Sequence, residues 1–379
     1  MEEEKKYLLS PGNYFMMGNE AIVEGALYAG CRFFAAYPIT PASEIGERMS
    51  TRMLQVGGVF IQMEDELGSI SSLIGASFAG KKAMTATSDV GFSLMQEGLS
   101  YGVNCEVPLV VVNVQRTRGF IHSAHADVMQ ARWGPTGDHQ MIVLIASSVQ
   151  ELFDLQIEAF NLSEQYRNPV ILLTEEMTAH MREKLTIPPI EEIKIVNRKK
   201  PTVPPEKYLP YAADESGVPP MSTFGDGYNV LYTMNPHDER GYNVWSAEIY
   251  DKLVRRISNK IKRDADRIFR YKVDFLDDSE VLVISYGVTA RSALEAVRRA
   301  REKGKRAGHI KLNTLWPSAE RTIRELTQRA KKVIVPEMNM GQYVLEIERI
   351  VKREIISLTK TTGYPFSAQE IFEEIERVL

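Results

Sequence analysis

The feature that most constrains the fold is a series of short apolar runs separated by longer amphipathic stretches over residues 1–186. The runs predict buried strands at Phe33–Tyr37, Val59–Met63, Ala83–Thr87, Leu109–Val114, Met141–Ala146 and Val170–Thr174. Helical patterns fall near residues 19–30, 42–55, 66–80, 91–104 and 149–166. Strands without polar alternation are covered on both faces, which is typical of a parallel sheet between helical layers. We therefore expect a doubly wound α/β domain.

A second, shorter α/β pattern occupies residues 275–379. Strands are expected at Val281–Ser285, His309–Asn313 and Lys332–Pro336, with helices near residues 289–303, 318–330, 342–355 and 368–379. Alternating strands and helices predict a second doubly wound parallel sheet.

Between these units, residues 187–274 form a different kind of segment. Proline pairs punctuate it at 188–189, 204–205 and 219–220, and apolar runs are scarce. It ends in a basic, helical segment, Tyr250 to Ile268. A connector this long without its own core is expected to wrap a neighbouring domain.

Composition excludes several classes of protein. The net charge is -4, with 46 basic and 50 acidic residues, which argues against a nucleic-acid binder. No apolar stretch is long enough for a membrane span, and the charged segment Met1–Lys6 is unlike a signal peptide. We therefore expect a cytoplasmic protein. Cys31 and Cys105 are too few for a disulfide framework or a metal cluster, and we expect both to be buried.

Polar residues follow the end of the first predicted strand, in the segment Tyr37-Pro38-Ile39-Thr40-Pro41-Ala42-Ser43-Glu44. The carboxyl edge of an open α/β sheet is where ligands bind, so the Thr40 hydroxyl is a candidate for ligand binding. Alternatively, Thr40 and Ser43 only cap the following helix.

A second strand end carries three carboxylates, in the segment Gln62-Met63-Glu64-Asp65-Glu66-Leu67. Acidic residues stabilise the start of any helix, which is one explanation. The helix that follows is rich in small and apolar residues, however, as in a helix packed between layers or against a partner. A carboxylate on its first turn can then hydrogen-bond a protonated heterocyclic nitrogen.

A third strand ends in Val112-Asn113-Val114-Gln115-Arg116. The planar guanidinium of Arg116 suits a carboxylate ligand. A structural arginine bonded to backbone carbonyls is equally compatible with the sequence.

Taken together, these segments resemble the α subunit of 2-oxoacid:ferredoxin oxidoreductases, and most closely the four-subunit 2-oxoglutarate type, with the branched-chain 2-oxoacid type as its near relative. The resemblance spans nearly the whole chain. It includes 37–41, 62–66, 84–88, 91–97, 127–134, 137–139, 170–174, 180–183, 237–241 and 285–292.

The resemblance implies a pyrimidine-binding domain of a thiamine-diphosphate enzyme over residues 1–186 and a transketolase C-terminal-like domain over residues 275–379. By analogy, Glu66 holds the aminopyrimidine of thiamine diphosphate and controls its tautomer. Glu64 is the alternative if the helix starts half a turn earlier. Thr40 and Arg116 would grip the carboxylate of the substrate.

One segment departs from the family pattern. In the family a glycine-rich turn usually follows the arginine, but this sequence continues with Thr117-Arg118-Gly119-Phe120-Ile121-His122-Ser123-Ala124-His125. Arg118, His122 and His125 either meet a distal substrate carboxylate or are solvated loop residues.

The chain lacks parts that this chemistry needs. Gly225-Asp226-Gly227 has neither the preceding strand nor the following asparagine of a diphosphate–Mg²⁺ motif, so we interpret it as a turn. Two cysteines cannot hold [4Fe–4S] clusters. The resemblance therefore implies a β subunit that carries the diphosphate-binding domain, with Mg²⁺ and the [4Fe–4S] clusters on partner subunits. It also implies ferredoxin-like γ and δ subunits, ferredoxin and coenzyme A as further partners.

The expected reaction is oxidative decarboxylation of a 2-oxoacid, with 2-oxoglutarate favoured, to acyl-CoA and CO₂ with reduction of ferredoxin. The alternatives are a branched-chain substrate such as 2-oxoisovalerate, or a non-catalytic scaffold or regulatory subunit. No contact with nucleic acid or a membrane is expected.

Overall fold

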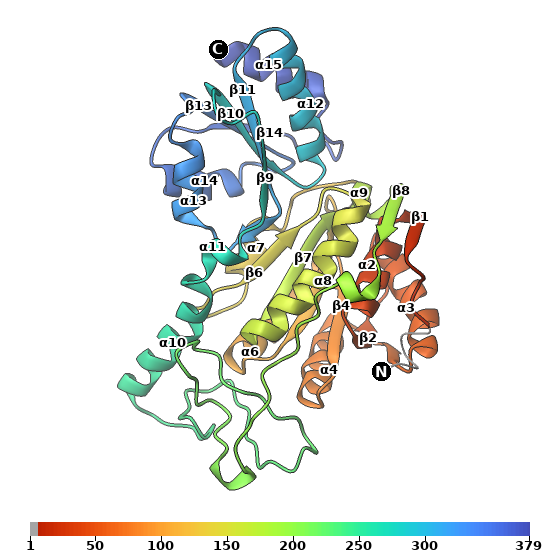
Figure 1. Cartoon of the computed structure of the whole chain (residues 1–379), viewed down its shortest axis with the longest axis vertical. Coiled ribbons are helices and arrows are strands. Elements are labelled where there is room, and N and C mark those ends of the chain that lie inside the picture. Colours follow the sequence, from red (N-terminus) through yellow and green to blue (C-terminus); the bar gives the residue numbers. More distant parts are fainter. Residues whose placement is uncertain (1–6) are drawn as a thin grey trace.

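The computed structural model describes residues 7–379 and contains two α/β units joined by a long connector (Figure 1). The larger unit is built on a sheet of order β12-β6-β7-β5-β4-β2-β3. All its neighbouring strands pair in parallel except β12, which is antiparallel to β6. Its strands are β2 (Cys31–Ala36), β3 (Val59–Gln62), β4 (Lys82–Thr87), β5 (Leu109–Gln115), β6 (Ile142–Ile145), β7 (Pro169–Glu175) and β12 (Thr314–Trp316).

Helices cover both faces of this sheet, which explains the continuous apolar strands. Val110 and Val112 of β5 pack in one cluster with α2, α3 and α8, whereas Val111 packs in a second cluster with α4, α5 and α6. The helices are α2 (Gly18–Tyr28), α3 (Ser43–Gln55), α4 (Glu66–Phe78), α5 (Val90–Leu94), α6 (Gln96–Asn104), α7 (Val128–Trp133), α8 (Val149–Tyr166) and α9 (Glu176–His180). The predicted doubly wound architecture is confirmed.

The smaller unit has the sheet order β14-β13-β10-β11-β9, parallel except for β9. Its strands are β9 (Tyr271–Asp274), β10 (Val281–Tyr286), β11 (Ala307–Leu312), β13 (Lys332–Glu337) and β14 (Ile356–Thr359). Its helices are α12 (Thr289–Glu302), α13 (Glu320–Thr327), α14 (Tyr343–Val351) and α15 (Ala368–Val378). Helices α12 and α15 pack together on one face, and α13 and α14 pack together on the other. This unit too is doubly wound, as predicted.

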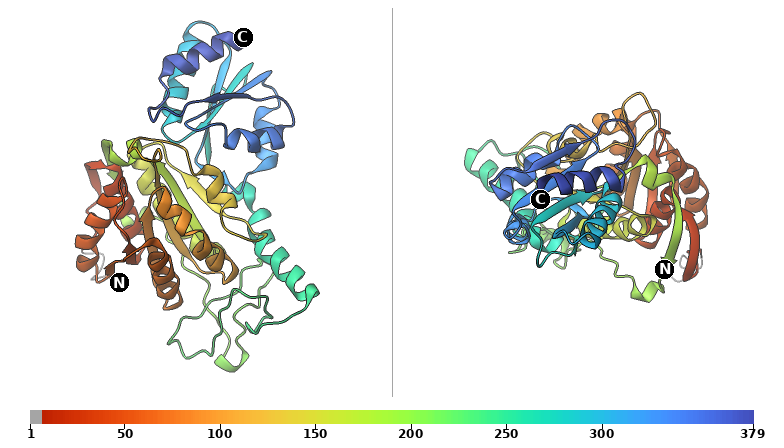
Figure 2. Two further views of the ribbon diagram at one scale, coloured as in Figure 1. Left: turned by 180° about the vertical axis from the view of Figure 1, so that it is seen from behind. Right: turned by 90° about the horizontal axis from the view of Figure 1, so that it is seen from above.

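The connector runs along the larger unit before it enters the smaller one, and the view from behind in Figure 2 shows the same path. It contains the short turns η1 (Ile190–Glu192) and η2 (Pro205–Lys207), then α10 (Ala247–Lys262) and α11 (Ala265–Ile268). The basic helix was therefore correctly placed, although it starts three residues earlier than Tyr250. The predicted limits of the connector, residues 187–274, stay a prediction.

Several local expectations were incomplete. The helix expected over 91–104 is divided at Met95, where the side chain of Gln96 donates to the Phe92 carbonyl at 2.7 Å. The exposed strand β9 and the antiparallel pair β1 (Gly12–Met17) with β8 (Arg182–Ile187) give no apolar run and were not expected. No helix among residues 7–379 is long and apolar enough to cross a membrane.

Candidate active site

Three neighbouring strands of the larger sheet end beside one another and bring their terminal polar groups together. β2, β4 and β5 are parallel neighbours, so the segments that follow them share one sheet edge. Arg116 Nη1 donates to the Thr40 carbonyl oxygen at 2.9 Å, and Arg116 Nη2 lies 3.4 Å from Asp89 Oδ2. The structure thus brings Thr40 and Arg116 into direct contact. Because the acceptor is a backbone carbonyl, this is also the bond that the structural alternative for Arg116 predicted.

The Thr40 hydroxyl does not cap the N-terminus of α3. Ala42 is the N-cap of this helix, and no side chain caps it. The hydroxyl of half-buried Thr40 lies 3.5 Å from Ser43 Oγ. The capping role considered for Thr40 and Ser43 is therefore wrong, and the hydroxyl remains a candidate for ligand binding.

Asp89 orients Arg116 and was not singled out in the sequence. Its φ of 49° and ψ of -114° lie in a sparsely populated region, which costs about 1–3 kcal/mol for a residue other than glycine. Strain of this kind concentrates at functional sites. Asp89 follows the end of β4, so the rule that found Thr40 and Arg116 would also have found it.

The three carboxylates before α4 have three different environments. Asp65 is the N-cap and accepts from the Gly68 N–H at 2.7 Å. Glu64 is exposed, whereas Glu66, the first residue of α4, is 5% exposed. Burial raises the pKa of Glu66 above its usual value, an effect only partly offset by hydrogen bonds that include one from Thr87 Oγ1 at 3.4 Å. Of the two candidate glutamates, only Glu66 is enclosed by the protein.

Gly91 faces Glu66 and allows it to occupy this position. A Cβ at Gly91 would lie 2.1 Å from Glu66 Oε1 and 2.2 Å from Thr87 Oγ1. Any side chain at Gly91 would displace the carboxyl group. The sequence showed this glycine within a family-like segment but gave no reason for it, because only the tertiary fold brings α5 against the start of α4.

The end of β4 links the two halves of this arrangement. Thr87 contacts Glu66, and Asp89, two residues later, contacts Arg116. A buried carboxyl group with a raised pKa and an arginine suited to carboxylates therefore lie on the same edge of the sheet. In such a pair the carboxyl group can accept and donate a proton, and the arginine can bind the carboxylate of an organic acid.

A family model described as pyruvate flavodoxin/ferredoxin oxidoreductase, thiamine diphosphate-binding, matches residues 24–256, which is more than half of the chain. The chain belongs to this family. The core domain II of pyruvate:ferredoxin oxidoreductase matches residues 279–371. The resemblance inferred from the sequence is therefore confirmed.

Individual relatives of the family agree with this assignment. The 2-oxoglutarate synthase subunit KorA of Methanothermobacter thermautotrophicus is 47% identical over 96% of this chain and 98% of its own length. The subunit of the same name from Methanocaldococcus jannaschii is 48% identical over 94% of this chain and 97% of its own length. The ketoisovalerate oxidoreductase subunit VorB of M. thermautotrophicus is 32% identical over 95% of this chain and 96% of its own length.

Solved structures of the family and of a more distant protein share the fold. The 2-oxoglutarate:ferredoxin oxidoreductase from Magnetococcus marinus, solved with 2-oxoglutarate, coenzyme A and succinyl-CoA bound, is 31% identical with a TM-score of 0.93. The match covers 97% of this chain but only 65% of that one. A split-gene transketolase has a TM-score of 0.56 over 96% of this chain and 98% of its own, at 12% identity, which is a likeness of fold alone.

The loop that departs from the family pattern is partly exposed and partly buried. Arg118 and His122 are exposed, as expected of solvated residues. His125 is not solvated, because it is fully buried at the junction of the two sheets and its N–H donates to the Met338 carbonyl at 3.0 Å. Burial lowers the pKa of His125 to about 3, so it is neutral at pH 7. Its burial also excludes the distal-carboxylate role.

The Gly225–Gly227 segment is a surface turn, as predicted. Both glycines have positive φ, 96° and 82°, and Asp226 is exposed. The Asp226 carboxylate lies 3.0 Å from Lys200 Nζ and accepts from the Thr223 N–H at 3.0 Å. Local contacts within the connector therefore account for this aspartate.

The surface beside Glu66 is apolar and largely exposed to solvent in this chain. Leu67, Ser71 and Gly75 are exposed along one face of α4. A cavity of about 530 Å³ lies between this helix and α6. Further exposed apolar residues are Val59 and Ile61 on the edge strand β3, and Val90 and Leu94 on α5. Apolar patches of this kind mark interaction surfaces.

Proposed function

We propose that this chain is the α subunit of a thiamine-diphosphate-dependent 2-oxoglutarate:ferredoxin oxidoreductase. The complex would convert 2-oxoglutarate and coenzyme A to succinyl-CoA and CO₂, with the electrons passing to ferredoxin. The observation that carries the proposal is the buried Glu66 on the same sheet edge as Arg116, in a chain of this family. Support for the substrate comes from the names of the relatives with 47–48% identity, and from the 2-oxoglutarate bound in the Magnetococcus marinus enzyme.

The residues around Glu66 fit the pyrimidine end of thiamine diphosphate. The carboxyl group is buried, its pKa is raised by that burial, and the facing Gly91 leaves no side chain in the way. Glu66 would share a proton with a ring nitrogen, because a carboxyl group with a raised pKa binds a proton more tightly. When bound, thiamine diphosphate supplies the carbon nucleophile for the 2-oxo carbon. Glu64 remains the alternative, but its exposure disfavours it.

Thr40 and Arg116 would bind the substrate carboxylate that becomes CO₂. The guanidinium offers paired donors that match a carboxylate, and the hydroxyl offers a further donor. Asp89 restrains the guanidinium at 3.4 Å, a separation long enough for an incoming carboxylate to compete. Holding the acid in a fixed orientation is the largest contribution these residues can make to the rate.

Other subunits would supply the diphosphate site, Mg²⁺ and the [4Fe–4S] clusters. Burial raises the pKa of Cys31 and of Cys105 to about 12, so both stay thiols and are unsuited to ligating iron. The apolar face of α4 beside Glu66 is suited to a β subunit that completes the cofactor site. The γ and δ subunits are expected from the resemblance to the four-subunit type.

The test is 2-oxoacid-dependent reduction of methyl viologen by the reconstituted complex. We expect 2-oxoglutarate to be preferred over 2-oxoisovalerate, and Glu66→Gln to lower kcat at least about a hundredfold. Glu64→Gln should change kcat little. Thr40→Val and Arg116→Ala should raise KM for 2-oxoglutarate.

Two outcomes would overturn parts of this proposal. If Glu64→Gln, rather than Glu66→Gln, abolished turnover, the assignment of the pyrimidine ligand would be wrong. If a Thr40→Val/Arg116→Ala double variant kept full activity, the site would be vestigial and the chain a scaffold subunit.

A further inference from the structure

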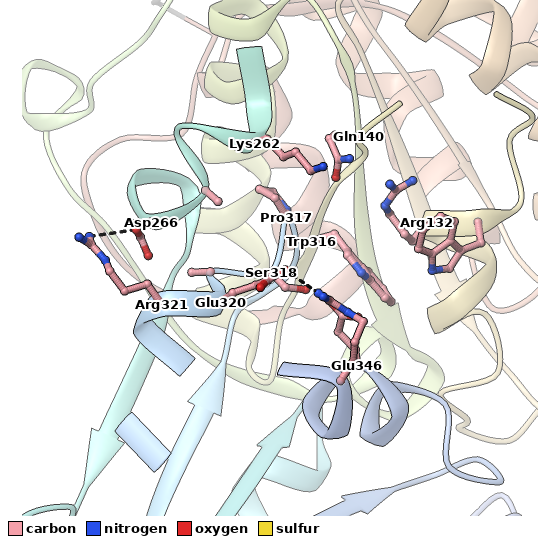
Figure 3. Close-up of a pocket in the computed structure, with 14 residues that line it drawn as sticks. Arg132, Gln140, Lys262, Asp266, Trp316, Pro317, Ser318, Glu320, Arg321 and Glu346 are labelled. Atoms are coloured by element: carbon pink, nitrogen blue, oxygen red, sulfur yellow. Dashed lines mark hydrogen bonds and ion pairs between the residues drawn. The ribbon is translucent and has the colours of Figure 1, made fainter. Parts of the chain in front are cut away.

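A second cavity, of about 510 Å³, lies between the two α/β units (Figure 3). Segments far apart in the sequence line it: α7 and the loop after it, the end of α10, the segment after β12, and α13 with α14. The cavity lies beside β12 and β6, the outermost strands on one side of the larger sheet. Glu66 follows β3, the outermost strand on the other side. The proposed active site does not use the cavity.

Arg132 is the most unusual residue of this cavity. It is 6% exposed, yet within residues 7–379 no hydrogen bond or ion pair reaches its guanidinium. It lies over the indole of Trp133, 4.1 Å from the ring centroid. Burial lowers the pKa of Arg132, and the nearest carboxylate to influence it, Glu346, lies beyond ion-pair distance. A buried charge without a counter-charge is costly, so an absent anion is the simplest explanation.

The carboxylates that line the cavity are already neutralised by other arginines. Glu346 Oε1 lies 2.8 Å from Arg349 Nη2, and Glu320 Oε1 lies 2.9 Å from the same nitrogen. Asp266 Oδ2 lies 3.0 Å from Arg321 Nη2. The ion pairs of all three are therefore with arginines other than Arg132, and Glu346 acts on Arg132 only from beyond ion-pair distance.

His139, buried close to Arg132, does not supply a counter-charge either. Both of its ring nitrogens lack a hydrogen-bond partner in the described part of the chain. Burial, together with the charge of Arg132, lowers the pKa of His139 to about 4, so the ring is neutral at pH 7.

A second cation and an apolar wall complete the cavity. Lys262, the last residue of α10, lines it, and in Figure 3 the amino group of Lys262 and the amide of Gln140 point toward each other. Trp316, which is 3% exposed, and Pro317 provide the apolar wall. Among residues 7–379, neither the buried Arg132 nor the exposed Lys262 forms an ion pair with a carboxylate, and the two cations match a ligand with two negative charges.

We propose that this cavity binds a small organic dianion, either a phosphate monoester or a dicarboxylate, through Arg132 and Lys262. The planar guanidinium of Arg132 binds the oxyanion of the ligand, and the tryptophan side chains that line the cavity contact its carbon skeleton. The inference rests on the cavity alone and holds whether or not Glu66 binds thiamine diphosphate.

Tryptophan fluorescence of the full chain provides a direct test. Trp133 and Trp316 line the cavity, whereas Trp245 is 95% exposed outside it, so Trp245→Phe leaves only the cavity signal. Titration with phenyl phosphate and with glutarate should give a saturable change for at least one of them, which also identifies the class of dianion. Phenol, which has no charge, should give none.

Replacement of Arg132 should change the melting temperature in an unusual direction. Without added anion, Arg132→Met should raise the melting temperature of the chain, because an uncompensated buried charge is lost. The active dianion should raise the melting temperature of the wild type by a few degrees and leave Arg132→Met unchanged. Arg298→Met, an exposed substitution on α12, should change neither value.

The proposal fails if neither dianion gives a saturable signal with the isolated chain, or if Arg132→Met responds as the wild type does. It also fails if Arg132→Met weakens assembly of the complex and the assembled wild type shows no dianion response. In that case a carboxylate of another subunit occupies the cavity.

Discussion

Two buried glutamates of this chain have opposite environments. Glu106, which follows α6, is fully buried and meets Arg256 Nη2 at 2.6 Å and Lys260 Nζ at 2.8 Å. Burial alone would raise the pKa of Glu106, but the positive charges of Arg256 and Lys260 lower it well below its usual range. Within the described part of the chain Glu66 has no cationic partner, and its pKa is raised.

The difference separates a carboxylate that is paired within the fold from the one that we propose for the cofactor. Arg256 and Lys260 belong to α10, so the ion pairs of Glu106 attach the connector to the larger unit. Buried Arg167 extends this attachment by donating to the carbonyls of Pro210 and Pro219 at 3.1 Å. Glu106 is satisfied within the chain. Glu66, beside an exposed apolar face, has hydrogen-bonding capacity left for another molecule.

The largest expected effect comes from removing the charge of Glu106. Glu106→Gln leaves the buried ammonium of Lys260 without a counter-charge, which should lower the free energy of unfolding by about 3–5 kcal/mol. Urea unfolding of the isolated chain measures this change. Glu248→Gln, which breaks an exposed pair on the same helix, should leave the free energy of unfolding almost unchanged. Equal effects would show that the ion pairs of Glu106 do not stabilise the fold.

The next effect should appear in activity rather than in stability. In Gly91→Ala the new methyl group occupies space held by the Glu66 carboxyl group, so kcat of the reconstituted complex should fall about a hundredfold. Circular dichroism should show an unchanged fold. The matched control is Gly46→Ala on α3, where a Cβ meets nothing within 4 Å. Full activity of Gly91→Ala would contradict the role given to Glu66.

Glu175 lies between these two cases, because it is hydrogen-bonded like Glu106 but has a raised pKa like Glu66. Its replacement should give the smallest change of the three. Glu175 accepts hydrogen bonds from the Val288 N–H and from Thr178 Oγ1, but it has no cationic partner in the described chain. Burial raises the pKa of Glu175 to about 7. Because the folded state holds this proton more tightly than the unfolded state, stability should fall as pH rises from about 4.5 to 7.

Replacement of Glu175 tests this explanation. Glu175→Gln stays neutral and keeps an oxygen for the Val288 N–H, so the variant should be more stable than the wild type by about 1–2 kcal/mol near pH 8. Near pH 4.5 the two proteins should be alike. Urea unfolding at both values measures the difference, with the exposed Glu302→Gln as control. A pH-independent difference would mean that Glu175 does not titrate as its burial implies.

Much of the fold was predictable because it depends on burial of local segments. The apolar runs became strands β2 to β7, and most of these strands are covered on both faces, the exposed edge strand β3 being the exception. Strand β12 could not be assigned in advance, because it lies among the elements of the smaller unit yet pairs with β6 of the larger one. Three residues carry too little pattern to indicate which sheet they join.

The candidate site was predictable to a similar degree. Thr40 and Arg116 were identifiable because both follow strand ends, and the structure brings them together across the end of β4. Glu66 and Glu64 are two residues apart, and a small shift of the helix start exchanges their environments. Asp89 could have been found because it follows the end of β4, whereas Gly91 acts through its contact with Glu66, which no spacing in the sequence reveals.

The sequence by itself determined the order of strands and helices, the family, and the strand ends that carry polar residues. These properties follow from hydrophobic periodicity and residue type, which are local. The tertiary structure decided which side chains meet. Among residues 7–379 it gave Glu106 two cationic partners, left Glu66 without a cationic partner and Arg132 without an anionic one, and buried His125 between the sheets. The physical reason is that burial and charge compensation depend on residues far apart in the chain, whose contacts only folding establishes.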